Sequence, residues 1–110
     1  MPRIPRVEKM IFYNISTKID PQLADAWLEW YKQEHIPEIM ATGCFESYRL
    51  FRLLDQDDRD GLTYVIQFRT GNLSQYKSFC GKYEPGFNRQ AAEKWGDHYV
   101  CYRTSMELVQ

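Results

Sequence analysis

His35 is the side chain best suited by type and position to acid–base chemistry. It follows Trp27 and Tyr31 at four-residue spacing, so the three side chains are predicted to share one face of a helix. An imidazole titrates near neutral pH, and a helix C-terminus there would favour its charged form. We therefore predict His35 as a catalytic acid or base, with Trp27 and Tyr31 as ligand-binding neighbours. The alternative is a structural histidine that packs on Tyr31 or caps the last helix carbonyls.

Polar side chains inside otherwise apolar stretches provide the remaining candidates. Four of them are predicted as ligand-binding residues: Arg49, Arg52, Gln67 and Arg103. Guanidinium groups bind carboxylates through paired hydrogen bonds, so the arginines indicate a ligand with an anionic group. In the alternative interpretation these residues are solvated, and Arg49 or Arg52 pairs with Glu46 or Glu107 across strands.

Metal and cofactor chemistry find no support in the sequence. The second histidine, His98, is predicted to lie in an exposed loop, and the three cysteines form no CxxC pair. Cys44 lacks an activating base and is expected to be a small buried thiol. The aspartates of residues 55–61 lack the glutamate that would complete a calcium loop, so we interpret them as turn residues. We expect no metal and no cofactor.

The composition restricts the class of protein. The chain of 110 residues with a net charge of −1 predicts one domain without the basic surface that nucleic acids or anionic membranes attract. No apolar run is long enough to span a bilayer, and no secretory signal is evident. An odd number of cysteines indicates reduced thiols and a cytoplasmic location. Residues 1–9 are expected to form an extended arm, and residues 10–110 the folded domain.

The order of predicted elements defines a fold. Strands are expected over residues 10–18, 45–54, 62–69 and 99–109, with helices over 21–42 and 73–95. The first helix is expected to kink or break at Pro37, and the second to bend or divide at Pro85. This β-α-β-β-α-β order predicts a ferredoxin-like α+β fold, in which two helices cover one face of a four-stranded antiparallel sheet.

Both faces of the predicted sheet carry apolar side chains, although two helices cover only one. The simplest cover for the open face is a second copy, which would give a homodimeric α/β barrel. Alternation along the strands places Asn14, Gln67, Arg69 and Arg103 on this open face. Arg49 or Arg52 would join them, depending on the register of the second strand.

RNA-binding domains with the same element order carry a sequence motif that this chain lacks. Their third strand requires aromatic residues and glycine where this chain has Leu62 and Thr63. We expect no nucleic-acid partner.

The segments WLEW…HIPEIMATGCFESYRLFRLLD, LTYVIQF and YVCYRTSMELV resemble an uncharacterised bacterial family of short single-domain proteins, a domain of unknown function. The resemblance covers residues 10–109 and implies no activity. More distantly, a helix that ends in His35-Ile36-Pro37 resembles the dimeric α+β barrel superfamily. That group includes cofactor-free monooxygenases, haem-degrading enzymes, dehydratases, isomerases and non-catalytic ligand-binding dimers. Some members have a histidine near the mouth of their pocket, and His35 is the one residue of this chain to which that resemblance applies.

Two functions follow as hypotheses. The first is a homodimeric small-molecule-binding domain that acts as a cofactor-free enzyme on a small anionic or aromatic metabolite. The second is a non-catalytic structural or regulatory dimerisation module. A cavity that contains His35 and an arginine would favour the first, and a solidly packed sheet face with His35 in solvent would favour the second.

Overall fold

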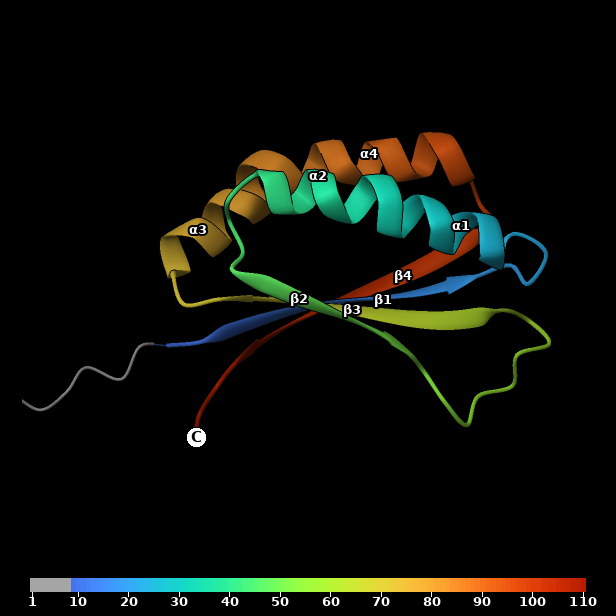
Figure 1. Ribbon diagram of the computed structural model, residues 1–110, viewed down its shortest axis with the longest axis horizontal. Helices are drawn as coiled ribbons and strands as arrows, with labels where there is room; N and C mark the ends of the chain where they lie inside the picture. The colour runs from blue at the N-terminus through green and yellow to red at the C-terminus, as the bar shows by residue number, and fades with distance from the viewer. Residues whose placement is uncertain (1–8) are drawn as a thin grey trace, which may run out of the picture.

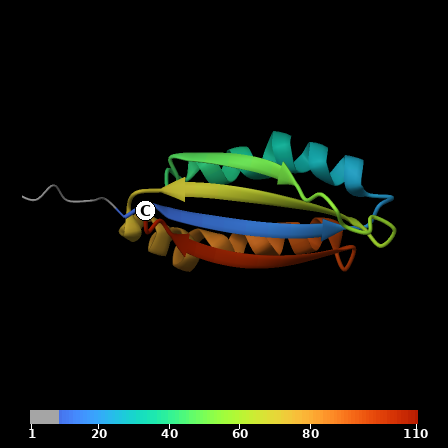
Figure 2. The same cartoon turned by 90° about the horizontal axis from the view of Figure 1, so that it is seen from below.

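The structure is a computed structural model that describes residues 9–110, in which two helical runs cover one face of a four-stranded sheet (Figure 1). The strands are β1 (Ile11–Ile19), β2 (Ser47–Arg52), β3 (Leu62–Thr70) and β4 (Tyr99–Glu107). They lie side by side in the order β2-β3-β1-β4, and every pair is antiparallel (Figure 2). The predicted ferredoxin-like fold is confirmed. The predicted arm, apart from Lys9, lies outside the described residues.

The first helical run is continuous and contains one wide turn. It consists of α1 (Ala24–Trp30), the π-helical turn η1 (Tyr31–His35) and α2 (Ile36–Ala41). The backbone N–H of Ile36 donates to the carbonyl of Tyr31, five residues back, and Pro37 then falls in the first turn of α2. A proline is tolerated there because its missing N–H needs no partner. The regular α-helix is therefore interrupted near Pro37, as predicted, but by a wide turn that keeps the run continuous. His35 consequently lies inside the helical run instead of at its C-terminus.

The second helical run repeats this arrangement. It consists of α3 (Leu73–Ser78), the π-helical turn η2 (Phe79–Tyr83) and α4 (Glu84–Trp95). A proline again follows the wide turn by two residues, at Pro85. The run begins at Asn72, whose Oδ1 accepts from the N–H of Gln75 at 3.0 Å, and ends at Gly96 with a φ of 61°. Both ends agree with the sequence-based prediction.

The hydrophobic core lies between the sheet and the helices. Alternate residues of β1 point into it, while Ile66 and Phe68 of β3 are completely buried. Phe45 precedes β2 and packs against Phe68 and Phe79, with 4.8 Å between ring centroids in both pairs. These contacts tie the start of β2 to the second helical run. The predicted core side of the third strand is confirmed.

β4 is oriented opposite to the prediction. Its pairing with β1 places Arg103 opposite Ile15, on the side that faces the helices. The more apolar set, Val100, Tyr102 and Met106, points to the open face, with exposed fractions of 52%, 69% and 43%. The placement of Arg103 with Gln67 and Arg69 is therefore wrong. The prediction failed because it assigned the more apolar side of this edge strand to the core.

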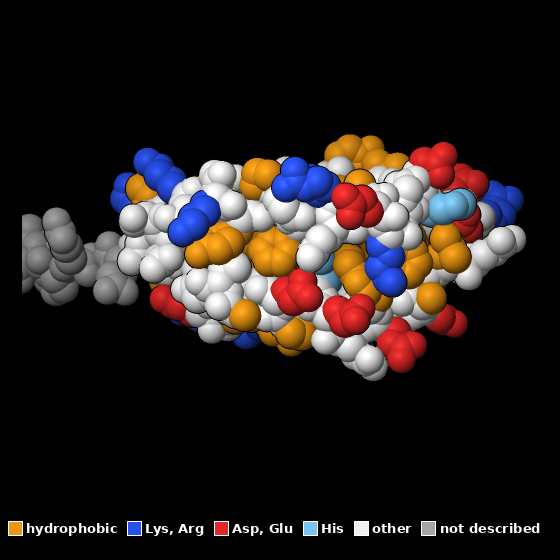
Figure 3. Space-filling view, turned by 90° about the horizontal axis from the view of Figure 1, so that it is seen from above, with side chains coloured by type: hydrophobic (Ala, Val, Ile, Leu, Met, Phe, Trp, Pro, Cys, Tyr) orange, Lys and Arg blue, Asp and Glu red, His pale blue; other side chains and the backbone are white. Residues whose placement is uncertain are grey.

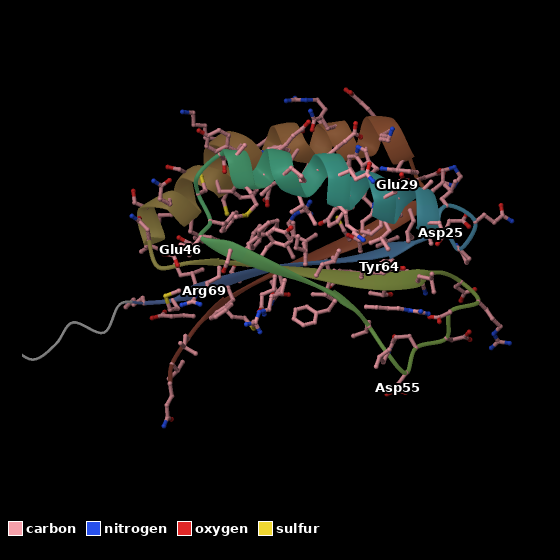
Figure 4. The ribbon with its side chains drawn as sticks, viewed as in Figure 1. Asp25, Glu29, Glu46, Asp55, Tyr64 and Arg69 are labelled. Carbon is pink, nitrogen blue, oxygen red and sulfur yellow. The ribbon has the colours of Figure 1, made fainter. Side chains whose placement is uncertain are left out.

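The register of β2 separates the two arginines that the sequence left unresolved. Arg49 lies opposite Gln67 and thus on the open face, whereas Arg52 lies opposite Tyr64 and points to the helical side. At that edge, Arg52 Nη2 donates to Asp58 Oδ2 at 2.9 Å in the exposed β2–β3 connection. That connection hangs below the sheet, with Asp55 at its tip (Figure 4).

A substitution at Gly61 tests this connection. A Cβ at Gly61 would lie 2.7 Å from the carbonyl oxygen of Ile19, and the φ of 154° is unfavourable for other residues. We expect Gly61→Ala to lower the free energy of unfolding by about 1–3 kcal/mol. Gly86→Ala is the matched control: its Cβ meets nothing within 4 Å inside α4, so it should raise stability by about 0.5–1 kcal/mol. Urea unfolding measures both, and equal effects would contradict the close approach.

Candidate functional site

A small cavity of about 30 Å³ lies between the helical side of the sheet and the two helical runs. Its walls come from β1, β4, the first helical run and α4. They are formed by Ile15, Thr17, Trp27, Trp30, Tyr31, His35, Asn88, Ala91, Tyr99, Cys101 and Arg103. The structure thus brings together four predicted site residues: His35, Trp27, Tyr31 and Arg103. Hydrophobic side chains lie along the middle of the helical face above this region (Figure 3).

His35 is enclosed by aromatic rings. Its exposed fraction is 6%. The imidazole lies 4.5 Å from the ring of Trp30 and 5.3 Å from that of Tyr31, measured between centroids. Phe87 of α4 contacts it edge-on at 5.6 Å. Both helical runs therefore hold this ring in place.

Burial determines the protonation state of His35. Desolvation lowers the pKa of the imidazole to about 4, because the charged form loses its hydration. Since His35 lies within the helical run, the predicted stabilisation of imidazolium by a helix C-terminus does not apply. The ring is neutral at pH 7, so one nitrogen donates and the other accepts.

One nitrogen of this ring has no partner. His35 Nδ1 is fully buried and makes no hydrogen bond within residues 9–110. Leaving a buried polar atom unpaired costs about 1–3 kcal/mol. Such an atom beside a cavity is a suitable contact for a bound molecule.

A network of hydrogen bonds and one ion pair joins β4, α4 and β1, and it includes two lining residues of the cavity, Asn88 and Arg103. Arg103 Nε lies 3.6 Å from Glu84 Oε2, and an Arg103 Nη2 hydrogen donates to Asn88 Oδ1. The Tyr13 hydroxyl also donates to Glu84. The side chain of Arg103 is 32% exposed, so it connects the cavity to the surface. Burial and Glu84 raise the pKa of Tyr13 well above its usual range, so its phenol stays protonated.

Three predicted binding residues do not belong to this cavity. Arg49 and Gln67 lie on the opposite face of the sheet, and Arg52 pairs with Asp58 at the edge. Three residues of this region were not predicted from the sequence to be site residues: Trp30, Asn88 and Glu84. For Trp30 the available signal was its position beside Tyr31. Glu84 and Asn88 stand four residues apart on α4, a spacing that places them on one helix face.

His98 and Cys44 lie in the environments predicted for them. His98 is exposed, with Nδ1 3.7 Å from Asp20 Oδ2, and Cys44 is buried. Within residues 9–110, no group of three or more His, Cys, Asp or Glu side chains is arranged to hold a metal ion. In the same range, no helix is both long and apolar enough to cross a membrane.

Comparison with known proteins identifies the family. Residues 10–109 match the family described as a domain of unknown function, DUF4286. The chain belongs to this family. The resemblance inferred from the sequence is confirmed, and the matched range covers every helix and strand of the DUF4286 fold seen here. No curated protein matches the chain in sequence.

Solved structures share the fold of this DUF4286 protein at low sequence identity. A conserved protein of unknown function from Bacteroides thetaiotaomicron has a TM-score of 0.66 and 14% identity, covering 93% of this chain and 100% of its own. A single-residue mutant of SnoaB, a cofactor-independent oxygenase from Streptomyces nogalater, has 0.64 and 16%, with coverages of 94% and 96%. A dimeric ferredoxin-like protein from an uncultured marine organism has 0.60 and 10%, with coverages of 93% and 96%. At these identities the similarity is one of fold.

Acid should destabilise the protein through His35. Between its folded pKa of about 4 and its ordinary value of 6.5, the unfolded chain binds a proton that the folded chain does not. The stability contributed by this residue is therefore complete above pH 6.5 and is lost, by roughly 3 kcal/mol, as the pH falls from 6.5 to 4. Urea unfolding at a series of pH values measures the loss.

Two variants test whether His35 causes the loss of stability at low pH. His35→Phe should remove this component of the pH dependence, while His98→Ala, which alters the exposed histidine, should retain it. An unchanged slope in His35→Phe would show that other groups are responsible.

Proposed function

We propose that the protein is a homodimeric small-molecule-binding domain. We propose further that it is a cofactor-free enzyme, which acts on a small anionic or aromatic metabolite in the cavity around His35. The observation that carries the proposal is the buried, neutral imidazole of His35, with an unpaired Nδ1, in a cavity that it shares with Arg103. Aromatic walls suit a planar ligand, and the guanidinium suits its anionic group. The cofactor-independent oxygenase among the structural neighbours supports this choice.

The chemistry that fits is proton transfer. His35 would accept a proton from an O–H or activated C–H group of the ligand and become imidazolium. The resulting anion would remain beside imidazolium and Arg103, and both charges stabilise it in a site that excludes water. A low pKa makes the free histidine a weak base, but an adjacent anion raises the pKa of imidazolium and makes the transfer feasible.

Entry of a metabolite requires Arg103 to move. A volume of about 30 Å³ is close to that of a single water molecule. Arg103 bridges β4 to Glu84 and Asn88 of α4, and its partial exposure places it between the cavity and solvent. A ligand carboxylate would replace Glu84 as the partner of Arg103.

The small volume of the cavity also favours the second candidate function, a non-catalytic dimerisation module in which His35 only packs the core.

The second copy would cover the open face of the sheet. Val100, Tyr102 and Met106 of β4 and Phe51 of β2 are exposed there. Covering such an apolar surface removes it from water and provides the main stabilisation of a dimer. The dimeric ferredoxin-like neighbour supports this arrangement. The three free cysteines support a cytoplasmic location, where thiols stay reduced.

A thermal-shift screen with aromatic carboxylates tests the ligand proposal. At about 100 times its Kd, a ligand should stabilise the wild-type protein by about 2.7 kcal/mol. His35→Phe and Arg103→Ala should reduce that stabilisation to near zero, while His98→Ala should leave it unchanged. Equal stabilisation of His35→Phe and the wild type would exclude the His35 cavity as the binding site.

Light scattering tests the dimer. The wild type should have twice the 13.2 kDa mass of one chain. Met106→Asp on the open face should give monomers, because it places an unpaired charge in the interface. Leu73→Asp is the matched control, since Leu73 is similarly exposed but lies on α3, over the other face. A monomeric wild type at micromolar concentration would refute the dimer.

A further inference from the structure

A second group of polar side chains lies on the open face of the sheet, away from the His35 cavity. A hollow of about 190 Å³ is formed there by Phe12, Ser47, Tyr48, Arg49, Gln67 and Arg69. The strand register explains why they gather: Arg49 is paired with Gln67, and Arg69 is flanked by Ser47 on β2 and Phe12 on β1. Figure 4 shows Arg69 near the end of the sheet remote from Asp55.

Neither arginine of this hollow has an acidic partner. Within residues 9–110, no carboxylate oxygen lies within 4.0 Å of Arg49 or Arg69. The two glutamates that the sequence offered as cross-strand partners are engaged elsewhere. Glu46 Oε1 accepts from the backbone N–H of Gly71 at 3.2 Å, and Glu107 pairs with Lys9 at 3.5 Å. The interpretation of Arg49 as a cross-strand ion pair is therefore wrong.

Two unpaired cations on one face carry an energetic cost that an anion would remove. Arg49 and Arg69 lie on the same face of adjacent strands, one residue pair apart on that face, so their charges repel. In water the repulsion is small. It becomes large when the face is covered, because a charge removed from water needs a counter-charge. A dimer built on this face therefore requires negative charge at this hollow.

We propose that Arg49 and Arg69 form a binding site for a small oxyanion, a carboxylate or a phosphate, on the open face of the sheet. Two guanidinium groups can each donate paired hydrogen bonds to oxygen atoms of one anion. Gln67 and Ser47 add neutral hydrogen-bonding groups, and Phe12 supplies an apolar wall for an attached ring. The site is independent of the His35 cavity, which lies on the other side of the same sheet.

Calorimetric titration with inorganic phosphate and with benzoate, at constant ionic strength, tests the site. The wild type should bind at least one of them saturably. Arg49→Ala and Arg69→Ala should each weaken that binding at least tenfold, and Arg49→Lys should weaken it less than Arg49→Ala. Arg52→Ala is the matched control, because it removes an arginine from the same strand on the opposite face, and it should bind like the wild type.

The result also distinguishes this site from the proposed function. His35→Phe should bind the anion with wild-type affinity, so failure at one site leaves the other intact. The proposal is overturned if neither anion binds the wild type, or if all variants bind equally. It is also overturned if Arg49→Ala and Arg69→Ala halve the mass seen by light scattering without the wild type binding either anion. The arginines would then pair with carboxylates of the second copy.

Discussion

The structure depends on one constraint: two helical runs cover a single face of a four-stranded sheet. The side chains sealed by that cover are mainly aromatic and aliphatic, and His35 lies there among the rings of Trp30, Tyr31 and Phe87. Everything on the other face keeps contact with water or needs a partner. The same sheet thus supplies a desolvated imidazole on one side and hydrated guanidinium groups on the other. Their chemistry differs because their dielectric surroundings differ.

The parts of the fold that follow from the sequence are those in which local pattern and tertiary packing agree. β1 and β3 alternate strongly and lie in the middle of the sheet, so their buried sides could be assigned. The predicted range of the second helical run, residues 73–95, is also confirmed, and the structure has a side-chain cap at Asn72 and a positive φ at Gly96. In these regions the local preference of each residue type and its packing in the fold favour the same conformation.

The failures occur where two effects compete. β4 is an edge strand whose more apolar side faces away from the helices, so counting apolar residues gave the wrong face for Arg103. Pro37 disfavours an ordinary helix interior, but a wide turn before it keeps the run continuous past His35, and residue propensities do not reveal such a turn. The candidate site was consequently predicted as one cluster. The structure separates it into a cavity around His35 and a hollow around Arg49.

The two π-helical turns also change the direction in which side chains spaced by four residues point around the helix axis. In an α-helix each residue advances by about 100°, so side chains spaced by four residues overshoot a full turn by about 40° at each step. Over the two steps from Trp27 to His35 the overshoot would turn the imidazole by about 80° from the direction of the Trp27 side chain. The π-helical turn takes more residues per revolution and cancels this rotation, as η2 does between Phe79 and Phe87. The contact between His35 and Phe87 therefore depends on both π-helical turns, η1 in the first helical run and η2 in the second.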